Sequence, residues 1–235
     1  MSALVDAEQL KRELKHDPPV LLDVRWTLAG SDRAGYLAGH LPGAVFCDLD
    51  TDLSGPPGPG GRHPLPDRTE LTATFARLGV GPTTSVVVYD GGVAAAAARA
   101  WWCLRWVGHE DVRVLDGGLP EWQAASGPIE TGDVPLQAAP APSSSNAATA
   151  RAGSASTMPT RSAEDILAGD VRVLLDARAP ERFRGEDEPV DPVAGHIPGA
   201  QSLHTAHLLD AEGRYLPGRL LRELFADAGA MATSR

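Results

Sequence analysis

Apolar residues come along the chain in short blocks that predict helices and strands in alternation. Residues 10–14 have helical spacing, and the pair Pro18 and Pro19 ends that helix. The apolar run 20–22 follows at once and predicts a short buried strand. The alternation therefore begins within the first two dozen residues.

The same pattern continues toward residue 118. Residues 69–78, with Thr69 at the start and Gly79 after the end, predict a capped helix, and Val86–Tyr89 predicts a fully buried β-branched strand. Residues 94–106 predict a helix by propensity, and Val112–Leu115 predicts a further strand. Strands and helices in alternation predict an α/β fold whose parallel sheet is covered on both faces.

Part of this pattern occurs twice. Gly-His-Leu-Pro-Gly-Ala at 39–44 recurs as Gly-His-Ile-Pro-Gly-Ala at 195–200, and each copy follows an apolar run that ends in Asp-x-Arg, at 21–25 and 174–178. A third match places Phe225 150 residues after Phe75. By this offset the counterpart of Asp90 falls at position 240, beyond Arg235. We therefore expect two similar domains, the second truncated before that loop.

The repeats set the expected domain boundaries. Residues 1–131 form the first domain, and residues 158–235 form a partial second domain. Residues 132–157 between them are rich in Ala, Pro, Ser, Gly and Thr, which is typical of a linker. The second copy starts with a helix capped by Ser162 and a strand over 171–175, and it matches the first only as far as a helix ending near Gly229. Since two strands of its sheet have no counterpart, we expect it to be loosely held and open to proteolysis.

Composition narrows the possible partners. The 235 residues are 43% apolar and 22% charged, which is typical of a globular protein, and the net charge is −10. Binding to nucleic acid needs clustered Lys and Arg, so we expect no such partner. The sequence has neither an apolar run of the ~20 residues that cross a bilayer nor an export signal at its start, so we expect a cytoplasmic protein without membrane contact.

Several residue groups resemble cofactor or metal sites without meeting their requirements. The Gly- and Pro-rich stretch 54–62 lacks the Gly-Lys-Ser/Thr ending of a phosphate-binding loop, and its prolines remove the donors that an anion needs. His204 and His207 have helical spacing but no third ligand at a zinc spacing. Cys47 and Cys103 have no Cys-x-x-Cys spacing and are expected to be buried hydrophobic residues. We predict no metal and no cofactor.

The repeated polar residues are candidates for a structural role. Asp23 with Arg25, and Asp176 with Arg178, stand at the carboxyl ends of predicted strands, where ligands of α/β proteins bind. Because both copies carry the pair, we interpret it as a charge-assisted bond that ties loops together. The histidines of the two Gly-His turns, His40 and His196, are interpreted as packing residues.

The segment 179–189 lies between the Asp-x-Arg and Gly-His elements of the second copy and has no close match in the first. Arg182 and Arg184 flank Phe183, so in an extended or turning loop they point apart and only one faces a cleft. That arginine could hold a small dianion bidentately, or its acidic neighbours could make it a surface ion pair. The sequence leaves both interpretations open.

Together these motifs resemble the tandem-domain rhodaneses, the thiosulfate and 3-mercaptopyruvate sulfurtransferases. The resemblance rests on segments 174–178, 181–189 and 195–200, and on 112–118 in the first copy, and it covers essentially the whole chain. It implies two rhodanese-like α/β domains around parallel sheets. In it, the first copy corresponds to a non-catalytic domain in which Asp90 takes the place of the catalytic cysteine.

The resemblance also implies a reaction. A cysteine of the second domain takes sulfane sulfur from a small anionic donor, forms a persulfide and passes the sulfur to cyanide or a thiol, with Arg182 binding the donor. A second donor-binding arginine of the mercaptopyruvate enzymes falls near Asp191, whose opposite charge favours thiosulfate. Neither Cys47 nor Cys103 matches the catalytic position, which is expected near residue 240, so we expect this chain alone to be inactive.

Two functions remain after this comparison. The first is a sulfurtransferase whose donor site is Arg182. The second is a non-catalytic rhodanese-like binding module or an inactive remnant, which the missing cysteine favours. The intact Arg182 segment favours the first, because a module without catalysis has no physical need for that arginine.

Overall fold

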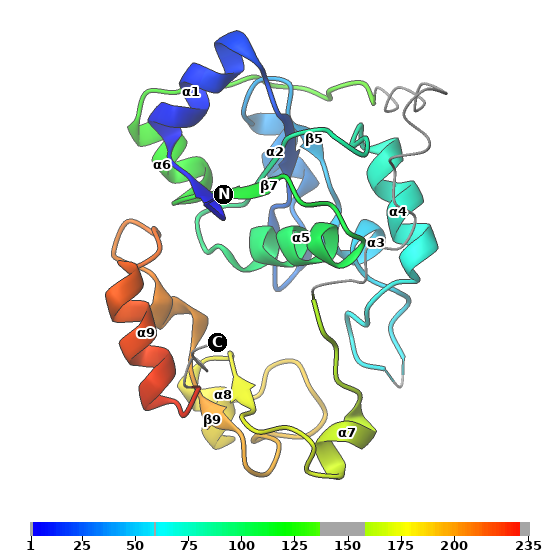
Figure 1. Cartoon of the computed structure of the whole chain (residues 1–235), viewed down its shortest axis with the longest axis vertical. Helices are drawn as coiled ribbons and strands as arrows, with labels where there is room; N and C mark the ends of the chain where they lie inside the picture. Colours follow the sequence, from blue (N-terminus) through cyan, green and yellow to red (C-terminus); the bar gives the residue numbers. More distant parts are fainter. Residues whose placement is uncertain (1, 59, 137–157, 231–235) are drawn as a thin grey trace. The chain divides into compact units, whose positions relative to one another are not determined.

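The computed structural model describes residues 2–58, 60–136 and 158–230, and it divides into two compact units, Met1–Met158 and Pro159–Arg235 (Figure 1). Among the residues that the structure describes, no helix is both long and apolar enough to cross a bilayer.

Unit 1 is built on a five-stranded sheet in which every strand is parallel to its neighbours. The order is β1-β7-β6-β2-β5, with bounds Leu4–Val5, Val112–Leu115, Val86–Tyr89, Val20–Asp23 and Val45–Phe46. All four residues of β6 are buried, because helices cover both faces of the sheet. The expected α/β fold with a parallel central sheet is confirmed.

The helices of unit 1 form two layers. On one face α3, α4 and α5 pack with Leu22 and Val88, and on the other α1 and α6 pack with Leu21 and Val87. Figure 1 shows α1 beside α6, where Lys11 Nζ donates to the carbonyl of Ala125 at 2.6 Å. Helix bounds are α1 Ala7–His16, α2 Arg33–Ala38, α3 Leu49–Asp52, α4 Arg68–Arg77, α5 Ala95–Trp106 and α6 Gly118–Ala124; a small hairpin joins β3 Trp26–Thr27 to β4 Gly30–Ser31.

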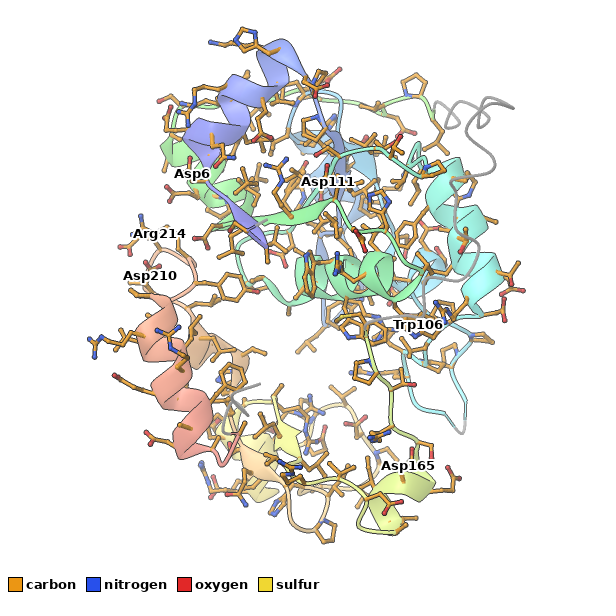
Figure 2. All side chains as sticks on the ribbon, in the orientation of Figure 1. Asp6, Trp106, Asp111, Asp165, Asp210 and Arg214 are labelled. Carbon is orange, nitrogen blue, oxygen red and sulfur yellow. The ribbon has the colours of Figure 1, made fainter. Side chains whose placement is uncertain are left out.

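Aspartates begin several of these helices. The Asp6 carboxylate, labelled in Figure 2, accepts the amide of Gln9 at 2.7 Å at the start of α1. At α4 the cap is Asp67, which accepts the amides of Thr69 and Glu70, so the expected start at Thr69 is wrong. Asp67 follows a proline in extended backbone, the conformation that a helix cap requires.

Unit 2 repeats the beginning of this arrangement. Strand β8 (Leu175–Asp176) pairs in parallel with β9 (Gln201–Ser202), as β2 pairs with β5. The helical elements are α7 Ala163–Leu167, α8 Pro180–Arg184, a 3₁₀ helix η1 Thr205–Leu208, and α9 Gly218–Asp227. Ser162 caps α7 with a capping box completed by Asp165, and the ion pair of Asp210 with Arg214 precedes α9 (Figure 2).

Two local expectations for unit 2 are wrong. The strand expected over 171–175 covers only Leu175–Asp176, because within the described residues β8 has a strand partner on one side whereas β2 has one on each. The segment around Arg182, expected as an extended or turning loop, contains the short helix α8. Pro180 suits the first turn of this helix and Gly185 ends it at φ +75°.

The strand residues of unit 1 are more deeply buried than their counterparts in unit 2. Leu21, Leu22 and Val24 of unit 1 are at most 2% exposed. Their counterparts Leu174 and Leu175 are half-buried, and Ala177 is exposed. Complete burial of such a side chain contributes roughly 1.5–3 kcal/mol, so unit 2 has far less hydrophobic stabilisation along its strand.

The expected linker begins on unit 1. The amide of Gly132 donates to the carbonyl of Leu37 at 2.9 Å, and that of Val134 donates to the hydroxyl of Tyr36 at 3.2 Å. Residues 137–157 of the expected linker lie outside the described residues. The boundary at residue 131 stays a prediction.

We expect amides of β8 and β9 to exchange with deuterium roughly 100-fold faster than those of β2 and β6, because local opening of unit 2 exposes few buried apolar groups. Hydrogen exchange read by mass spectrometry on the full chain measures this. Equal protection of the four strands would contradict the difference in stability argued from burial.

Candidate anion-binding site

The Asp-x-Arg pair of unit 1 forms a clamp between a strand end and the next turn. Arg25 donates from Nε to Oδ1 of Asp23 at 3.0 Å and from Nη2 to Oδ2 at 2.8 Å. The same Nη2 donates to the carbonyl of Gly39 at 2.8 Å. Both side chains are buried, so the charges neutralise each other away from water.

Unit 2 contains the same clamp in a more open setting. Arg178 donates from Nε to Asp176 Oδ1 at 3.0 Å, from Nη2 to Oδ2 at 2.7 Å, and from Nη2 to the Gly195 carbonyl at 2.6 Å. The hydrogen bond from Arg178 lowers the pKa of Asp176 below its usual value, and the same bond raises the pKa of Arg178. About 28% of the Arg178 side chain is exposed, against 10% for Arg25, so the clamp of unit 2 is more accessible to solvent.

The histidines of the two Gly-His turns stack on aromatic rings of the preceding short helices. His40 lies 4.2 Å from the ring of Tyr36 on α2, and His196 lies 3.8 Å from that of Phe183 on α8. In both, Nδ1 meets the carbonyl of the same aromatic residue, at 2.9 Å and 2.7 Å. Since a carbonyl only accepts, Nδ1 donates in both, and each ring is fixed against its aromatic neighbour. His40 is buried, whereas His196 is exposed.

Asp90 fills a nest of backbone amides at the beginning of α5. Its Oδ1 accepts the amides of Gly92 and Ala94 at 2.9 and 3.1 Å, and its Oδ2 accepts those of Ala96 and Ala97, both at 3.1 Å. The residue is only 1% exposed. Such a nest at a helix start is an anion site by its geometry. Here the side chain of the protein itself supplies the anion.

Both cysteines are buried in unit 1 and unsuited to nucleophilic chemistry. Each is 0% exposed. Burial raises the pKa of the Cys47 thiol well above its usual value and that of Cys103 to about 11. A thiol is reactive as its thiolate, so both are inert near neutral pH.

Arg182 belongs to a cluster of five charged residues in unit 2, which we call the arginine–carboxylate cluster: Asp176, Arg178, Arg182, Glu188 and Asp191. Arg182 donates from Nε and Nη2 to the two Glu188 oxygens at 3.2 and 2.7 Å, and from Nη2 to Asp191 Oδ2 at 2.7 Å. Arg178 Nη1 lies 3.3 Å from Glu188 Oε2 and 3.9 Å from Asp191 Oδ2.

Glu188 holds this cluster together. Its side chain is only 6% exposed, and its Oε1 also accepts the amides of Val190 and Asp191 at 3.1 and 2.9 Å. The hydrogen bond from Arg182 is the main cause that lowers the pKa of Glu188 to about 2. Glu188 is therefore ionised at any physiological pH.

A pocket of about 550 Å³ opens beside the cluster at the carboxyl end of β8. Its wall includes the charged residues Asp176, Arg178 and Asp191, with His196 and apolar residues such as Val193. Arg182 does not line it, so within the described residues Asp191 is the cluster member that touches both the pocket and Arg182. The guanidinium of Arg178 at this wall, with Arg182 behind Asp191, is the group that can bind a small anion there.

The structure brings together some of the expected site residues and reveals one that sequence reasoning missed. Asp176, Arg178, Arg182 and His196 meet around α8, and Asp23, Arg25 and His40 meet in the equivalent place of unit 1. Arg184 points elsewhere and pairs with Glu186 at 2.7 Å. Glu188 was not singled out, although its signal is present as an acid six residues after Arg182.

The pair His204 and His207 does not form part of this site. The two rings meet edge-on at 5.4 Å around η1. Among residues 2–58, 60–136 and 158–230, no group of three or more His, Cys, Asp or Glu side chains is placed to hold a metal ion.

Comparison with known proteins points to one family. The model of the rhodanese-like domain matches residues 6–125. The protein named "Putative thiosulfate sulfurtransferase SseB" from Mycobacterium tuberculosis is 47% identical over 219 residues, which cover 91% of this chain and 74% of the relative. The "Probable 3-mercaptopyruvate sulfurtransferase" of Pseudomonas aeruginosa is 42% identical over 228 residues, covering 95% of this chain and 78% of the relative.

Solved structures give the same result. The 3-mercaptopyruvate sulfurtransferase SseA of Escherichia coli is 30% identical, with a TM-score of 0.74, over 97% of this chain and 84% of its own. The 3-mercaptopyruvate sulfurtransferase of Leishmania major is 24% identical, with a TM-score of 0.78, over 97% of this chain and 62% of its own; at that identity the likeness concerns the fold alone.

We expect Asp90→Ala to destabilise unit 1 by about 3 kcal/mol, because it leaves four amides of the nest, two of them buried, without an acceptor. Urea unfolding followed by tryptophan fluorescence reports on unit 1 alone, since all five tryptophans lie there. The matched control is Asp67→Ala at the exposed cap of α4, with an expected loss of about 1 kcal/mol. Equal losses for the two variants would mean that the nest contributes no more than an ordinary cap.

Proposed function

This chain belongs to the rhodanese family, and we propose that it acts in sulfur transfer by binding a small anionic sulfur donor at the arginine–carboxylate cluster of unit 2. The observation that carries the proposal is the convergence of Arg178 and Arg182 at the end of β8, beside an open pocket. The carboxyl ends of parallel strands are where α/β proteins bind ligands. The pocket is therefore in the expected place.

The chemistry of the donors fits this cluster. Thiosulfate and 3-mercaptopyruvate, which appear in the names of the relatives, are small anions with planar or tetrahedral oxygen groups. A guanidinium group binds such oxygens through one edge, and Glu188 holds Arg182 through Nε and Nη2, so a donor would approach the edge formed by Nη1 and Nη2. We assign donor binding to Arg182, with Arg178 as a second cation. We favour thiosulfate because Asp191 stands near the position where the resemblance to the mercaptopyruvate enzymes calls for a second donor-binding arginine.

In this proposal the transfer proceeds through the persulfide of a cysteine other than Cys47 and Cys103. A thiolate attacks the outer sulfur of thiosulfate, the S–S bond of the donor breaks, and sulfite leaves with the electron pair. Cyanide then attacks the outer sulfur of the persulfide, thiocyanate forms, and the thiolate is restored. Cys47 and Cys103 are unsuited to this role, because both are buried and have raised pKa values.

A second candidate function is a non-catalytic binding module. For unit 1, the amide nest occupied by Asp90 favours a non-catalytic function, because a nest that holds a buried carboxylate has no room for a substrate anion. In this function the cluster of unit 2 binds an anion without turnover. Donor binding is common to both functions, and sulfur transfer separates them.

We expect Arg182→Gln to weaken thiosulfate binding at least about tenfold at low ionic strength, because it removes a bidentate cation from the cluster. Isothermal titration of the full chain with sodium thiosulfate measures this. Arg182→Lys, which keeps the charge and loses the fork, should fall between the two and guards against a folding defect.

The matched control is Arg184→Gln, since Arg184 lies on the same helix and pairs in solvent with Glu186. It should bind thiosulfate like the unsubstituted chain. Equal binding by the Arg182 and Arg184 variants would refute the donor site.

We expect neither thiol of this chain to carry transferable sulfur. After incubation with thiosulfate, intact-mass spectrometry should show no added sulfur on Cys47 or Cys103, and cyanide should yield no more thiocyanate than with the double variant Cys47→Ala/Cys103→Ala. A sulfur adduct on either residue that passes to cyanide would overturn this assignment.

A further inference from the structure

Asp191 is the exchangeable member of the arginine–carboxylate cluster. About 41% of its side chain is exposed, against 6% for Glu188. Within the described residues its carboxylate pairs with guanidinium groups only, at 2.7 Å from Arg182 and 3.9 Å from Arg178. Residues 191–194 are all exposed, so the carboxylate can rotate into solvent without disturbing a packed core.

Glu188 cannot play this part. Its side chain is only 6% exposed, it accepts two backbone amides as well as both arginines, and the bonds from Arg182 and from those amides hold its pKa at about 2, well below its usual value. Loss of its charge would leave those amides without a charged acceptor and would remove the partner that Arg178 and Arg182 share. Glu188 therefore fixes the positions of Arg178 and Arg182, whereas Asp191 only neutralises them.

The charge of the cluster opposes an incoming anion. Its two arginines face three carboxylates, so the group carries a net negative charge when all are ionised. An anion entering the pocket meets Asp191 at the wall before it can reach Arg182. It can bind both guanidinium groups only after the Asp191 carboxylate has moved away from them.

We propose that Asp191 is an internal competitor that occupies the donor position between Arg178 and Arg182, so that a small oxyanion binds by displacing its carboxylate. This deepens the proposed function and rests on it, because it concerns the same site. Asp191 sets the affinity and the threshold concentration of the donor without contacting the sulfur that is transferred. It acts on donor binding and leaves the fold unchanged.

The test is titration of Asp191→Asn with sodium thiosulfate, in the full chain at low ionic strength. Asparagine keeps the size of the side chain and removes the competing charge, so the dissociation constant should fall roughly fivefold. The double variant Asp191→Asn/Arg182→Gln should lose this gain, because the competition acts through Arg182. A merely structural role of Asp191 would produce no gain and no coupling to Arg182.

The matched control is Glu186→Gln, which removes one negative charge from an exposed pair in the same segment. It should change thiosulfate binding less than about twofold, since an exposed charge is screened by salt. Equal effects of Asp191→Asn and Glu186→Gln would show that only net charge matters and would overturn the proposal.

The outcomes for the donor site and for the competitor are distinguishable. If Arg182→Gln leaves thiosulfate binding unchanged, the donor site itself is wrong, whatever Asp191 does. If Arg182→Gln weakens binding and Asp191→Asn fails to strengthen it, the donor site stands and the competitor is refuted. If binding becomes measurable only in Asp191→Asn, the competitor is supported directly.

Discussion

The clamp between an Asp-x-Arg strand end and the next glycine carbonyl is the interaction on which both units depend. One guanidinium joins two groups that are close in space: the carboxylate two residues earlier, at the strand end, and the glycine carbonyl of the Gly-His turn. The short helix between strand and turn is thereby held as a closed loop, with its aromatic ring stacked on the histidine. A planar donor with fixed geometry suits this task, which lysine could not perform.

The clamp is buried in unit 1 and partly exposed beside a pocket in unit 2, because its surroundings differ. In unit 1 Asp23 is 0% exposed and Arg25 is 9% exposed, so the clamp has little surface for a ligand. In unit 2 the clamp arginine is partly exposed, and the segment after α8 brings Arg182, Glu188 and Asp191 against it. A structural element of the first copy has thus become the wall of a pocket in the second, without any change in its own hydrogen bonds.

Sequence reasoning succeeded where burial and local propensity agree. The strands at 20–22, Val86–Tyr89 and Val112–Leu115 lie in a covered parallel sheet, and α5 is rich in alanine. It failed where a longer-range partner decides. The strand expected at 171–175 shortened because its ladder has one described neighbour, and α8 formed because Pro180 and Gly185 define a single helical turn that periodicity is too short to reveal.

Glu188 was missed for a related reason. A carboxylate near an arginine ordinarily forms a solvated pair of little energetic consequence. Only the fold shows that the side chain of Glu188 is 6% exposed and also accepts two backbone amides. The two interpretations left open for Arg182, donor site or ion pair, are also not exclusive. Glu188 fixes the position of Arg182, and displacement of the Asp191 carboxylate would free Arg182 to bind a donor.

Asp90 and Asp191 both place a carboxylate at a site that suits an anion, and their difference in burial decides which carboxylate a ligand can replace. Asp90 reaches an amide nest from within the loop that makes the nest, and at 1% exposure it cannot be exchanged for a solute. Asp191 reaches its arginines from an exposed segment and can be exchanged at small cost in packing. Both are intramolecular anions at sites whose geometry suits a foreign one. The buried carboxylate of Asp90 gives its nest a structural role. The exposed carboxylate of Asp191 leaves Arg178 and Arg182 able to bind a solute anion at a concentration high enough to displace it.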